Sequence, residues 1–383
     1  MKHISGLLFL SLLIFCAAQA QNIDSLMVVL DTAKNEQKVK TLNELCRAYM
    51  QFDPVKAVGY AREALNAGTE INDARGTAAA YNNIGVAYRN QGALDKALEF
   101  YINALKLYET LQNKEGIASA KNNISTIYSI KGDYASALKF LEESHKILTE
   151  INDEQKLVGS LNNLGNLNNN LELYENAMNN FSESYALSEK LGKPFPDPLN
   201  NIGNVFFKQN NFQRAIEYYL KALELERSVN NRLGMLNTLA NIGIAYTKAE
   251  QPDPAQKYLG EAYLLAQELK VNSEIPDILK NSSYNYYRQG KLAEAYIVIL
   301  KYDSARERIY GEESSRRIAQ MEMVLELSDK EREYEALKKT AEVKTLQLRN
   351  SRLFIVMIFL SVLLVVGIAN YFFTDKIREF FRK

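Results

Sequence analysis

Asparagine recurs in this chain at a fixed step, so its amide side chains are the first candidates for a binding role. One series advances by 40, 40, 38, 40 and 40 residues and comprises Asn83, Asn123, Asn163, Asn201, Asn241 and Asn281. Asparagine is a mediocre helix former, so its presence in one slot of six predicted helices needs a reason. An amide both donates and accepts hydrogen bonds, so a row of amides can hold the main chain of a peptide whatever its side chains are.

Further asparagines share the predicted helix face of this series, namely Asn82, Asn122, Asn162 and Asn200, with Asn166 and Asn204 further along. We expect the whole set to line a groove that binds an extended peptide or protein segment. The alternative is that the amides bond to the neighbouring repeat and only hold the stack together. The pattern alone leaves both interpretations open.

A fainter basic stripe has the same period and consists of Lys208, Lys248 and Arg288. On the groove side of the helices these cations would make half of the groove electropositive and suited to acidic or carboxylate-bearing segments. The alternative is three solvated surface charges, which contribute little to stability or binding.

The elements that position these residues follow from two series of small residues with the same period. The first is Gly85, Ser125, Gly165, Gly203, Gly243 and Ser283, and the second is Ala97, Ala137, Ala177, Ala215, Ala255 and Ala295. Self-similarity at this period indicates stacked supersecondary units. Around each small residue, apolar positions recur three, four and seven residues apart, which predicts two amphipathic helices per unit. Small residues are needed where the two helices cross.

The turn within each unit has its own signal. Gly92, Gly132 and Gly290 fall where the first helix of a unit ends, and a left-handed residue is expected there. Other units have Glu172, Asn210 or Glu250 in that slot. Glycine is therefore preferred there, and it is not required.

The resulting pattern, xNxGxxYxxxGxxxxAxxxYxxAL, resembles the tetratricopeptide repeat across residues 38–302. The resemblance implies an all-α fold of about seven antiparallel helix pairs, stacked into a right-handed superhelix whose concave groove is lined by the first helix of each pair. In tetratricopeptide proteins that bind extended peptides, asparagines at the matching slot grip the main chain of the ligand. The resemblance therefore favours a groove role for the asparagine series.

The amino-terminal residues predict export. Residues 1–20 combine Lys2, an apolar run and the small-residue site Ala18-Gln19-Ala20, which is the composition of a cleaved signal peptide. The alternative is a lipoprotein signal acylated at Cys16, which the bulky Phe15 before it disfavours. Residues 21–37 would form a lead-in to the repeats.

Beyond the repeats, residues 303–352 hold 22 charged residues of 50, with 11 of each sign, and predict a long solvated helix. Apolar positions between Leu327 and Leu348 approximate a heptad seam that lysines interrupt. We expect a parallel coiled-coil homodimer here. The alternative is a single amphipathic connector lying against the last repeat.

Residues 353–373 are 21 uncharged, mostly apolar residues, enough to span a bilayer as a helix. Residues 374–383 carry four basic and two acidic residues, the charge bias of a cytoplasmic tail. Together with the signal peptide, these segments predict a single-pass inner-membrane protein with a periplasmic repeat array and a cytoplasmic carboxyl terminus.

Composition and motifs argue against several function classes. Lys plus Arg equals Asp plus Glu, 46 against 46, so no net field attracts nucleic acid. Two histidines, no HExxH or GxSxG motif and no glycine-rich phosphate loop leave no predicted catalytic, metal or cofactor site. Once residues 1–20 are removed, Cys46 is the lone cysteine and is expected to be a packed core thiol.

The leading hypothesis is therefore a membrane-anchored, non-catalytic scaffold that binds a peptide or protein segment. The order of segments also resembles the sensor half of bacterial membrane histidine kinases and helix-turn-helix regulators. The ten residues after the predicted span are too few to fold into such an output domain. The alternative function is thus a sensor subunit that relays ligand binding to a separate kinase or regulator, or a truncated relative of such proteins.

Overall fold

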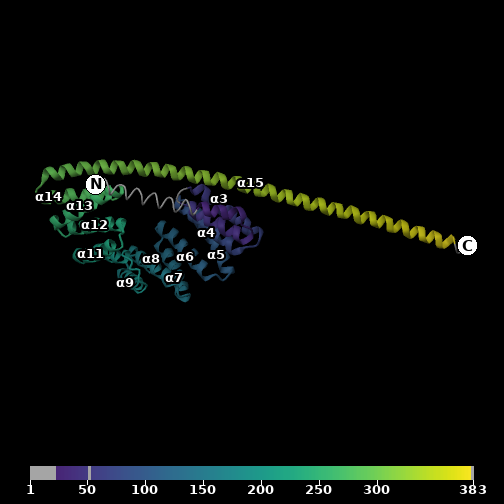
Figure 1. Ribbon diagram of the computed structural model, residues 1–383, viewed down its shortest axis with the longest axis horizontal. Coiled ribbons are helices and arrows are strands. Elements are labelled where there is room, and N and C mark those ends of the chain that lie inside the picture. Colours follow the sequence, from purple (N-terminus) through teal and green to yellow (C-terminus); the bar gives the residue numbers. More distant parts are fainter. Residues whose placement is uncertain (1–22, 51–52, 381–383) are drawn as a thin grey trace. The chain divides into compact units, whose positions relative to one another are not determined.

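The computed structural model describes residues 23–50 and 53–380, and within these ranges all regular structure is helical. A helix over 23–32 precedes the helices named in Figure 1. The bounds of the helices that follow are α2 Asn35–Tyr49, α3 Pro54–Glu70, α4 Ala74–Asn90, α5 Leu94–Thr110, α6 Lys114–Ile130, α7 Tyr134–Glu150, α8 Glu154–Asn170, α9 Tyr174–Lys190, α10 Asp197–Lys208, α11 Phe212–Ser228, α12 Arg232–Lys248, α13 Pro252–Leu269, α14 Ile275–Arg288 and α15 Leu292–Phe380. The predicted signal peptide lies outside the described residues.

Local sequence fixes where many of these helices begin. Asp73, Asp133 and Asp153 stand directly before α4, α7 and α8, and each carboxylate accepts a hydrogen bond from the backbone N–H three residues later. Asn113 and Asn231 do the same for α6 and α12. These side chains satisfy one of the donors that a helix start leaves unpaired.

The predicted left-handed slot between the helices of a unit is confirmed. Gly92, Gly132 and Gly290 have φ angles of +77°, +80° and +74°. Glu172 and Glu250 adopt φ of 61° and 59° in the same slot. The turn geometry is therefore kept whatever the residue, and non-glycine residues adopt a conformation that is costly for a side chain with a Cβ.

The two helices of a unit cross at the predicted small residues. A Cβ added to Gly85 would lie 2.6 Å from Tyr101 Cε1, and one added to Gly203 would lie 2.5 Å from Tyr219 Cδ1. Aromatic rings stack beside the crossing, as in the pair Tyr88–Phe100 with centroids 5.5 Å apart. The glycines thus let α4 and α10 approach the rings of α5 and α11, which confirms the packing role predicted for this series.

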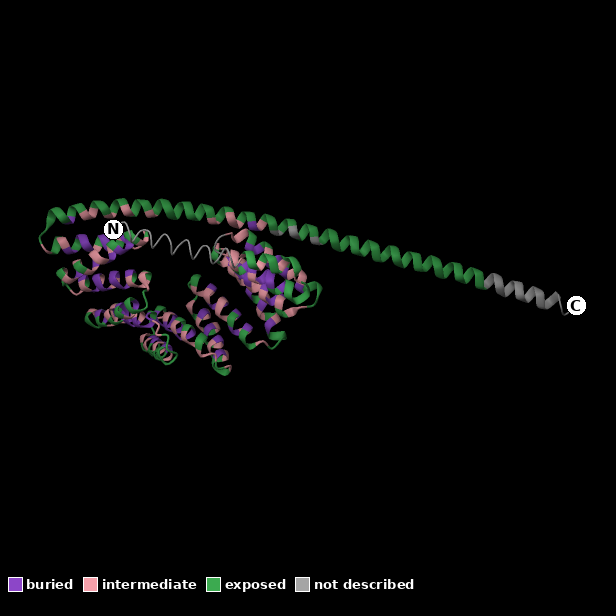
Figure 2. Cartoon of the chain, viewed as in Figure 1, coloured by how far each residue is buried: buried purple, intermediate pink, exposed green. Residues whose placement is uncertain are grey.

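The helices of the array fall into two rows with different neighbours. We call the first helix of each pair, from α2 to α14, the A helix and the second the B helix. From α2 to α12 each A helix packs against the B helix of its own pair, and from α4 to α14 each packs against the preceding B helix. The pairs α2·α4, α8·α10, α10·α12 and α12·α14 also contact one another directly. Because A helices contact successive A helices, we place them on the inner side of the array. Figure 2 shows a buried and an exposed face on the array helices.

The single 38-residue step has a structural cause. The A helix α10 spans 12 residues, whereas α4, α6, α8 and α12 span 17 each. Pro194, Pro196 and Pro198 precede or begin α10, and proline cannot donate a backbone hydrogen bond within a longer helix. The helix is therefore shortened at its amino-terminal end.

The last helix joins three segments that the sequence separates by composition. The second helix of the last pair, the charged segment and the apolar segment are all parts of α15, which runs unbroken over 89 residues. The chain divides into two compact units, Met1–Met323 and Val324–Lys383, and this division falls within α15. Within the described residues one helix is long and apolar enough to cross a membrane, with a stretch of mean hydropathy 2.1 in Leu292–Gly367 and no buried residue in that stretch.

Candidate functional site

The predicted asparagine series forms a ladder between neighbouring A helices. Asn123 Nδ2 donates to Asn82 Oδ1 at 2.8 Å, and Asn201 Nδ2 donates to Asn162 Oδ1 at 3.0 Å. The remaining rungs of this kind are Asn83 to Asn43 at 2.8 Å and Asn241 to Asn200 at 3.2 Å. In each rung the amide donates to an asparagine about 40 residues earlier in the chain. These four amides therefore make contacts within the stack.

Two predicted residues have other partners. Asn281 Nδ2 donates to the carbonyl of Asp277 in its own helix at 2.8 Å, because Ala240 stands where a partner asparagine would be. Asn204 accepts a hydrogen bond from the Tyr219 hydroxyl at 2.7 Å. Asn204 thus helps to hold the tyrosine that fills the α10–α11 crossing.

One rung of the ladder is open, and we name Asn122 and Asn163 the open rung. By sequence these two positions match the bonded pairs on either side, yet among the hydrogen bonds of the described residues none reaches either side chain. Both residues instead line a pocket of about 310 Å³ between α6, α7 and α8. Asn163 is exposed, and Asn166 lies half-buried one turn further along α8. The structure thus brings together two of the predicted groove residues around an accessible space.

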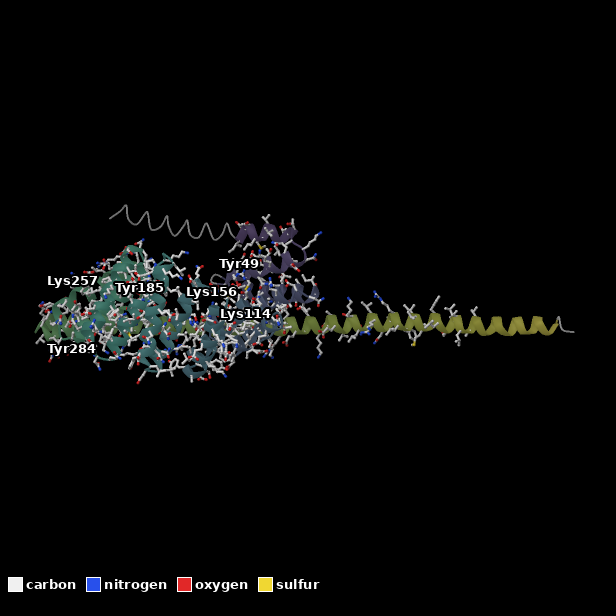
Figure 3. All side chains as sticks on the ribbon, turned by 90° about the horizontal axis from the view of Figure 1, so that it is seen from below. Tyr49, Lys114, Lys156, Tyr185, Lys257 and Tyr284 are labelled. Atoms are coloured by element: carbon white, nitrogen blue, oxygen red, sulfur yellow. The ribbon has the colours of Figure 1, made fainter. Side chains whose placement is uncertain are left out.

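Hydroxyl and amide groups dominate the polar lining of this pocket. Ser119 and Ser160 line it beside the open rung, and His145 Nδ1 lies 3.2 Å from Ser160 Oγ. Burial lowers the pKa of His145, with the charge of Glu183 opposing that shift, so the imidazole is neutral near pH 7. Lys156 at the rim pairs with Glu115 and, at 3.0 Å, with Asp153; Figure 3 labels it. Such a lining suits the N–H and C=O groups of a main chain.

The predicted basic stripe is only partly free. Lys208 Nζ donates to the carbonyl of Asn169 at 3.1 Å, and Arg288 lies 3.5 Å from a Glu250 carboxylate oxygen. Lys248 is exposed at the end of α12. Two of the three cations therefore contact the preceding repeat.

Sequence reasoning missed several of these residues. Asn43 begins the ladder from α2, but the first unit departs most from the repeat pattern, and Asn43 lies 40 residues before Asn83. Extending the series backwards by one period would have found it. Ser119 and Ser160 carry no sequence signal, since only the packing of α6 and α8 on α7 makes them line the same pocket as the open rung.

Other chemistry has little support in the described part of the chain. There, no three His, Cys, Asp or Glu side chains are grouped as a metal site would need. Cys46 is fully buried, and burial raises the pKa of its thiol to about 12. Since the thiolate is the reactive form, Cys46 is an inert core thiol, as predicted.

Comparisons with known proteins address the fold. Residues 76–150 and 196–268 match the tetratricopeptide repeat family, and no curated protein matches the sequence. Similar solved structures include the apo form of RapI, with a TM-score of 0.57 and 16% identity over 72% of this chain and 99% of that one. Another is the apo form of the quorum sensor NprR from B. thuringiensis, with a TM-score of 0.57 and 18% identity over 78% of this chain and 84% of that one.

A third similar structure is a Rap protein complexed with Competence and Sporulation Factor, with a TM-score of 0.52 and 12% identity over 76% of this chain and 81% of that one. At such identities the likeness concerns the fold alone. The helix-pair repeat between α2 and α15 is continuous in the structure, including the stretch from 151 to 195 between the two matched segments.

Proposed function

Since this chain is a tetratricopeptide-repeat protein, we propose that it is a non-catalytic scaffold that binds an extended peptide or protein segment along its A helices. The fold is one that serves protein–protein interaction, and a similar structure is described as a Rap protein complexed with Competence and Sporulation Factor. The single observation that carries the proposal is the open rung of Asn122 and Asn163 beside a pocket of about 310 Å³.

The proposal divides the predicted asparagines into two groups. Amides that already bond across repeats, such as Asn201 and Asn241, stabilise the stack. The open rung is left to donate to and accept from a ligand main chain. A ligand amide pairing with each of these side chains would replace hydrogen bonds to water, a gain of about 1 kcal/mol per bond.

The experiment compares two matched double variants of the full-length chain in detergent. A pull-down with mass spectrometry identifies the bound segment, and a synthetic copy of it is titrated into each variant. We expect Asn122→Ala with Asn163→Ala to weaken binding by roughly tenfold or more while leaving the melting temperature unchanged. Asn201→Ala with Asn241→Ala should lower the melting temperature instead. Unchanged affinity in the first variant would contradict the proposal.

We further propose that the apolar part of α15 anchors the scaffold in the bacterial inner membrane, with the array in the periplasm. The stretch of mean hydropathy 2.1 supports a span, and the basic residues of 374–383 favour a cytoplasmic end. A cysteine introduced at Glu313 should then react with a membrane-impermeant maleimide in cells with a permeabilised outer membrane. One introduced at Thr374 should react only after lysis, and the reverse pattern would exclude this topology.

A second candidate function is a sensor subunit that passes ligand binding through a homodimeric coiled coil to a separate kinase or regulator. The observation in its favour is the unbroken course of α15 from the last repeat to the apolar stretch. Single cysteines placed between Leu327 and Leu348 should crosslink with a heptad period, and ligand should change the yields. If no position crosslinks between copies, with or without ligand, the dimeric relay is wrong.

A further inference from the structure

A second pocket lies at the carboxyl-terminal end of the array, and we name it the terminal pocket. It has a volume of about 650 Å³ and is lined by α13, the α13–α14 loop, α14 and residues 300–308 of α15. Its apolar lining includes Ile275 and Leu279, both buried, together with Leu300 and Ala305. It lies between two B helices and shares no lining residue with the pocket of the open rung.

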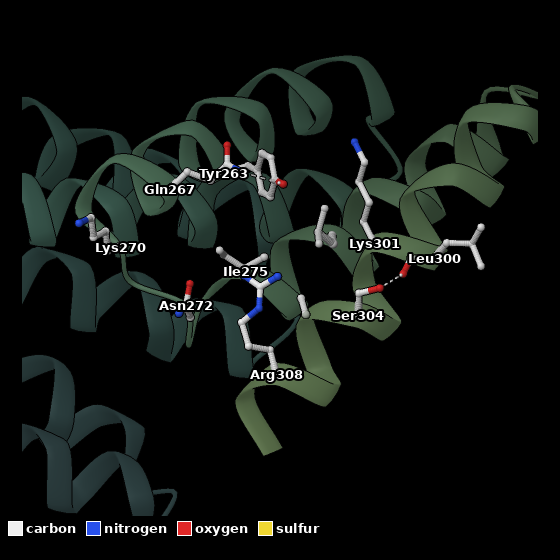
Figure 4. Close-up of a pocket in the computed structure, with 11 residues that line it drawn as sticks. Tyr263, Gln267, Lys270, Asn272, Ile275, Leu300, Lys301, Ser304 and Arg308 are labelled. Carbon is white, nitrogen blue, oxygen red and sulfur yellow. Dashed lines mark hydrogen bonds between the residues drawn. The ribbon is translucent and has the colours of Figure 1, made fainter. Parts of the chain in front are cut away.

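The charged residues that line the terminal pocket are all cationic. They are Lys270, Lys301 and Arg308, which Figure 4 shows around the space, one from the loop and two from α15. Gln267 and Asn272 add neutral polar groups. Asn272 Nδ2 also donates to Glu312, outside the lining, at 3.0 Å. The lining thus carries three positive charges and no carboxylate.

The repeat offers an internal comparison two units earlier. A pocket of about 630 Å³ between α9, α10 and α11 is lined by residues at equivalent positions. There Lys221 corresponds to Lys301, but Glu224 stands where the terminal pocket has Ser304, and Ser228 stands where it has Arg308. The same cavity recurs with its cation balanced by an acid, so the excess positive charge belongs to the terminal pocket and not to the repeat.

The intervening unit, α12 and α13, has charged residues at the same positions, and there each charge has a partner of opposite sign. Glu261 and Glu268 occupy the positions of Lys301 and Arg308, and they pair with Arg227 at 3.7 Å and with Arg232 at 2.5 Å. In the terminal pocket the two acids have become cations, and the two arginines have become Gln267 and Asn272. Among the ion pairs of the described residues none involves Lys270, Lys301 or Arg308.

We propose that the terminal pocket is a binding site for a small organic carboxylate with an apolar body. The carboxylate would accept hydrogen bonds from Arg308 and Lys301, which are charge-assisted and stronger than neutral ones. The apolar body would cover Ile275, Leu279 and Leu300, which supplies the hydrophobic part of the affinity. Such a ligand would contact α14 and residues 300–308 of α15 at once, so it would hold this part of α15 against α14. This site does not depend on the groove function proposed above.

The test titrates 4-phenylbutyrate into the full-length chain in detergent by calorimetry, with 4-phenylbutyramide as the uncharged control. The site predicts saturable binding of the carboxylate and binding of the amide that is about tenfold weaker or more. Lys301→Ala with Arg308→Ala should remove the difference between the two compounds. Ser304→Glu, which introduces the acid found in the equivalent pocket, should weaken binding of 4-phenylbutyrate while all three cations are kept.

Lys221→Ala in the equivalent pocket is the matched control, and it should leave carboxylate affinity unchanged. The gain-of-site variant Glu224→Ser with Ser228→Arg should add a second carboxylate site. Equal binding of the carboxylate and the amide would overturn the proposal. A loss of carboxylate affinity in Lys221→Ala would also overturn it, as would the absence of saturable binding at millimolar carboxylate. Because these side chains are exposed, the variants should keep the wild-type melting temperature.

Discussion

The carboxyl group of Glu226 should make the stability of the array depend on pH. Glu226 is 1% exposed at the end of α11. Its Oε1 accepts a hydrogen bond from Thr238 at 2.9 Å, while its buried Oε2 has no partner among the described residues. Burial raises the pKa of Glu226 to about 7 from 4.5, and the charge of Asp197 adds to the rise while the Thr238 bond opposes it.

The direction of the pH dependence of stability follows from which state, folded or unfolded, loses the Glu226 proton at lower pH. Between about pH 4.5 and pH 7 the unfolded chain ionises Glu226 while the folded chain keeps it protonated, so stability falls as pH rises through this window. Above pH 7 the carboxylate is ionised in both states and the loss is complete. The difference in pKa corresponds to about 3 kcal/mol.

Glu226→Gln removes this ionisation while keeping the shape of the side chain. The variant and the wild type should be similarly stable near pH 4, and the variant should be more stable by up to about 3 kcal/mol near pH 8. That difference corresponds to roughly 6–12 °C in melting temperature, measured on the full-length chain by far-ultraviolet circular dichroism. Glu224→Gln, on the exposed side of the same helix, should give no pH-dependent difference. If the effect of Glu226→Gln on stability is the same at both pH values, Glu226 does not titrate as described.

Two further predictions concern glycine slots and are checked by chemical denaturation. Gly85→Ala should lower the free energy of unfolding by about 1–3 kcal/mol, because the new Cβ would meet the fully buried Tyr101 ring. Gly260→Ala is the control, since the added Cβ has open space around it. It should leave the free energy of unfolding unchanged or raise it by up to about 1 kcal/mol. Glu172→Gly should stabilise by about 1 kcal/mol because φ is 61° there, and a destabilising result would show that the Glu172 side chain makes a contact worth more than the backbone strain.

Much of the fold could be predicted from local residue patterns. The period of the small residues gave the helix pairs, and Gly92 and Gly132 marked the left-handed turns, because helix crossings and turns depend on residues close in the chain. The continuity of α15 was not predicted as such. Composition changes near 302 and 352, but a change of composition alone does not end a helix. No proline occurs in α15, and the helix continues through Gly311 and Gly367.

Less of the candidate site than of the fold could be predicted from the sequence. The sequence placed asparagines on one helix face, yet Asn82, Asn122 and Asn162 look alike in it. Whether each amide meets a partner depends on the distance between successive A helices, which is set by how whole repeats pack. Only the structure shows that Asn82 and Asn162 are bonded and that Asn122 is open beside a pocket.

The repeat, the helix pairs, the turns and the apolar stretch can all be predicted without the structure, since each is a pattern along one chain. Which amides pair across repeats, and that Lys301 and Arg308 share a pocket with Lys270, can be seen only in the folded array. The physical reason is that a period fixes the face of a helix on which a side chain lies. Its partner comes from another repeat, and the packing of the two repeats brings them within reach.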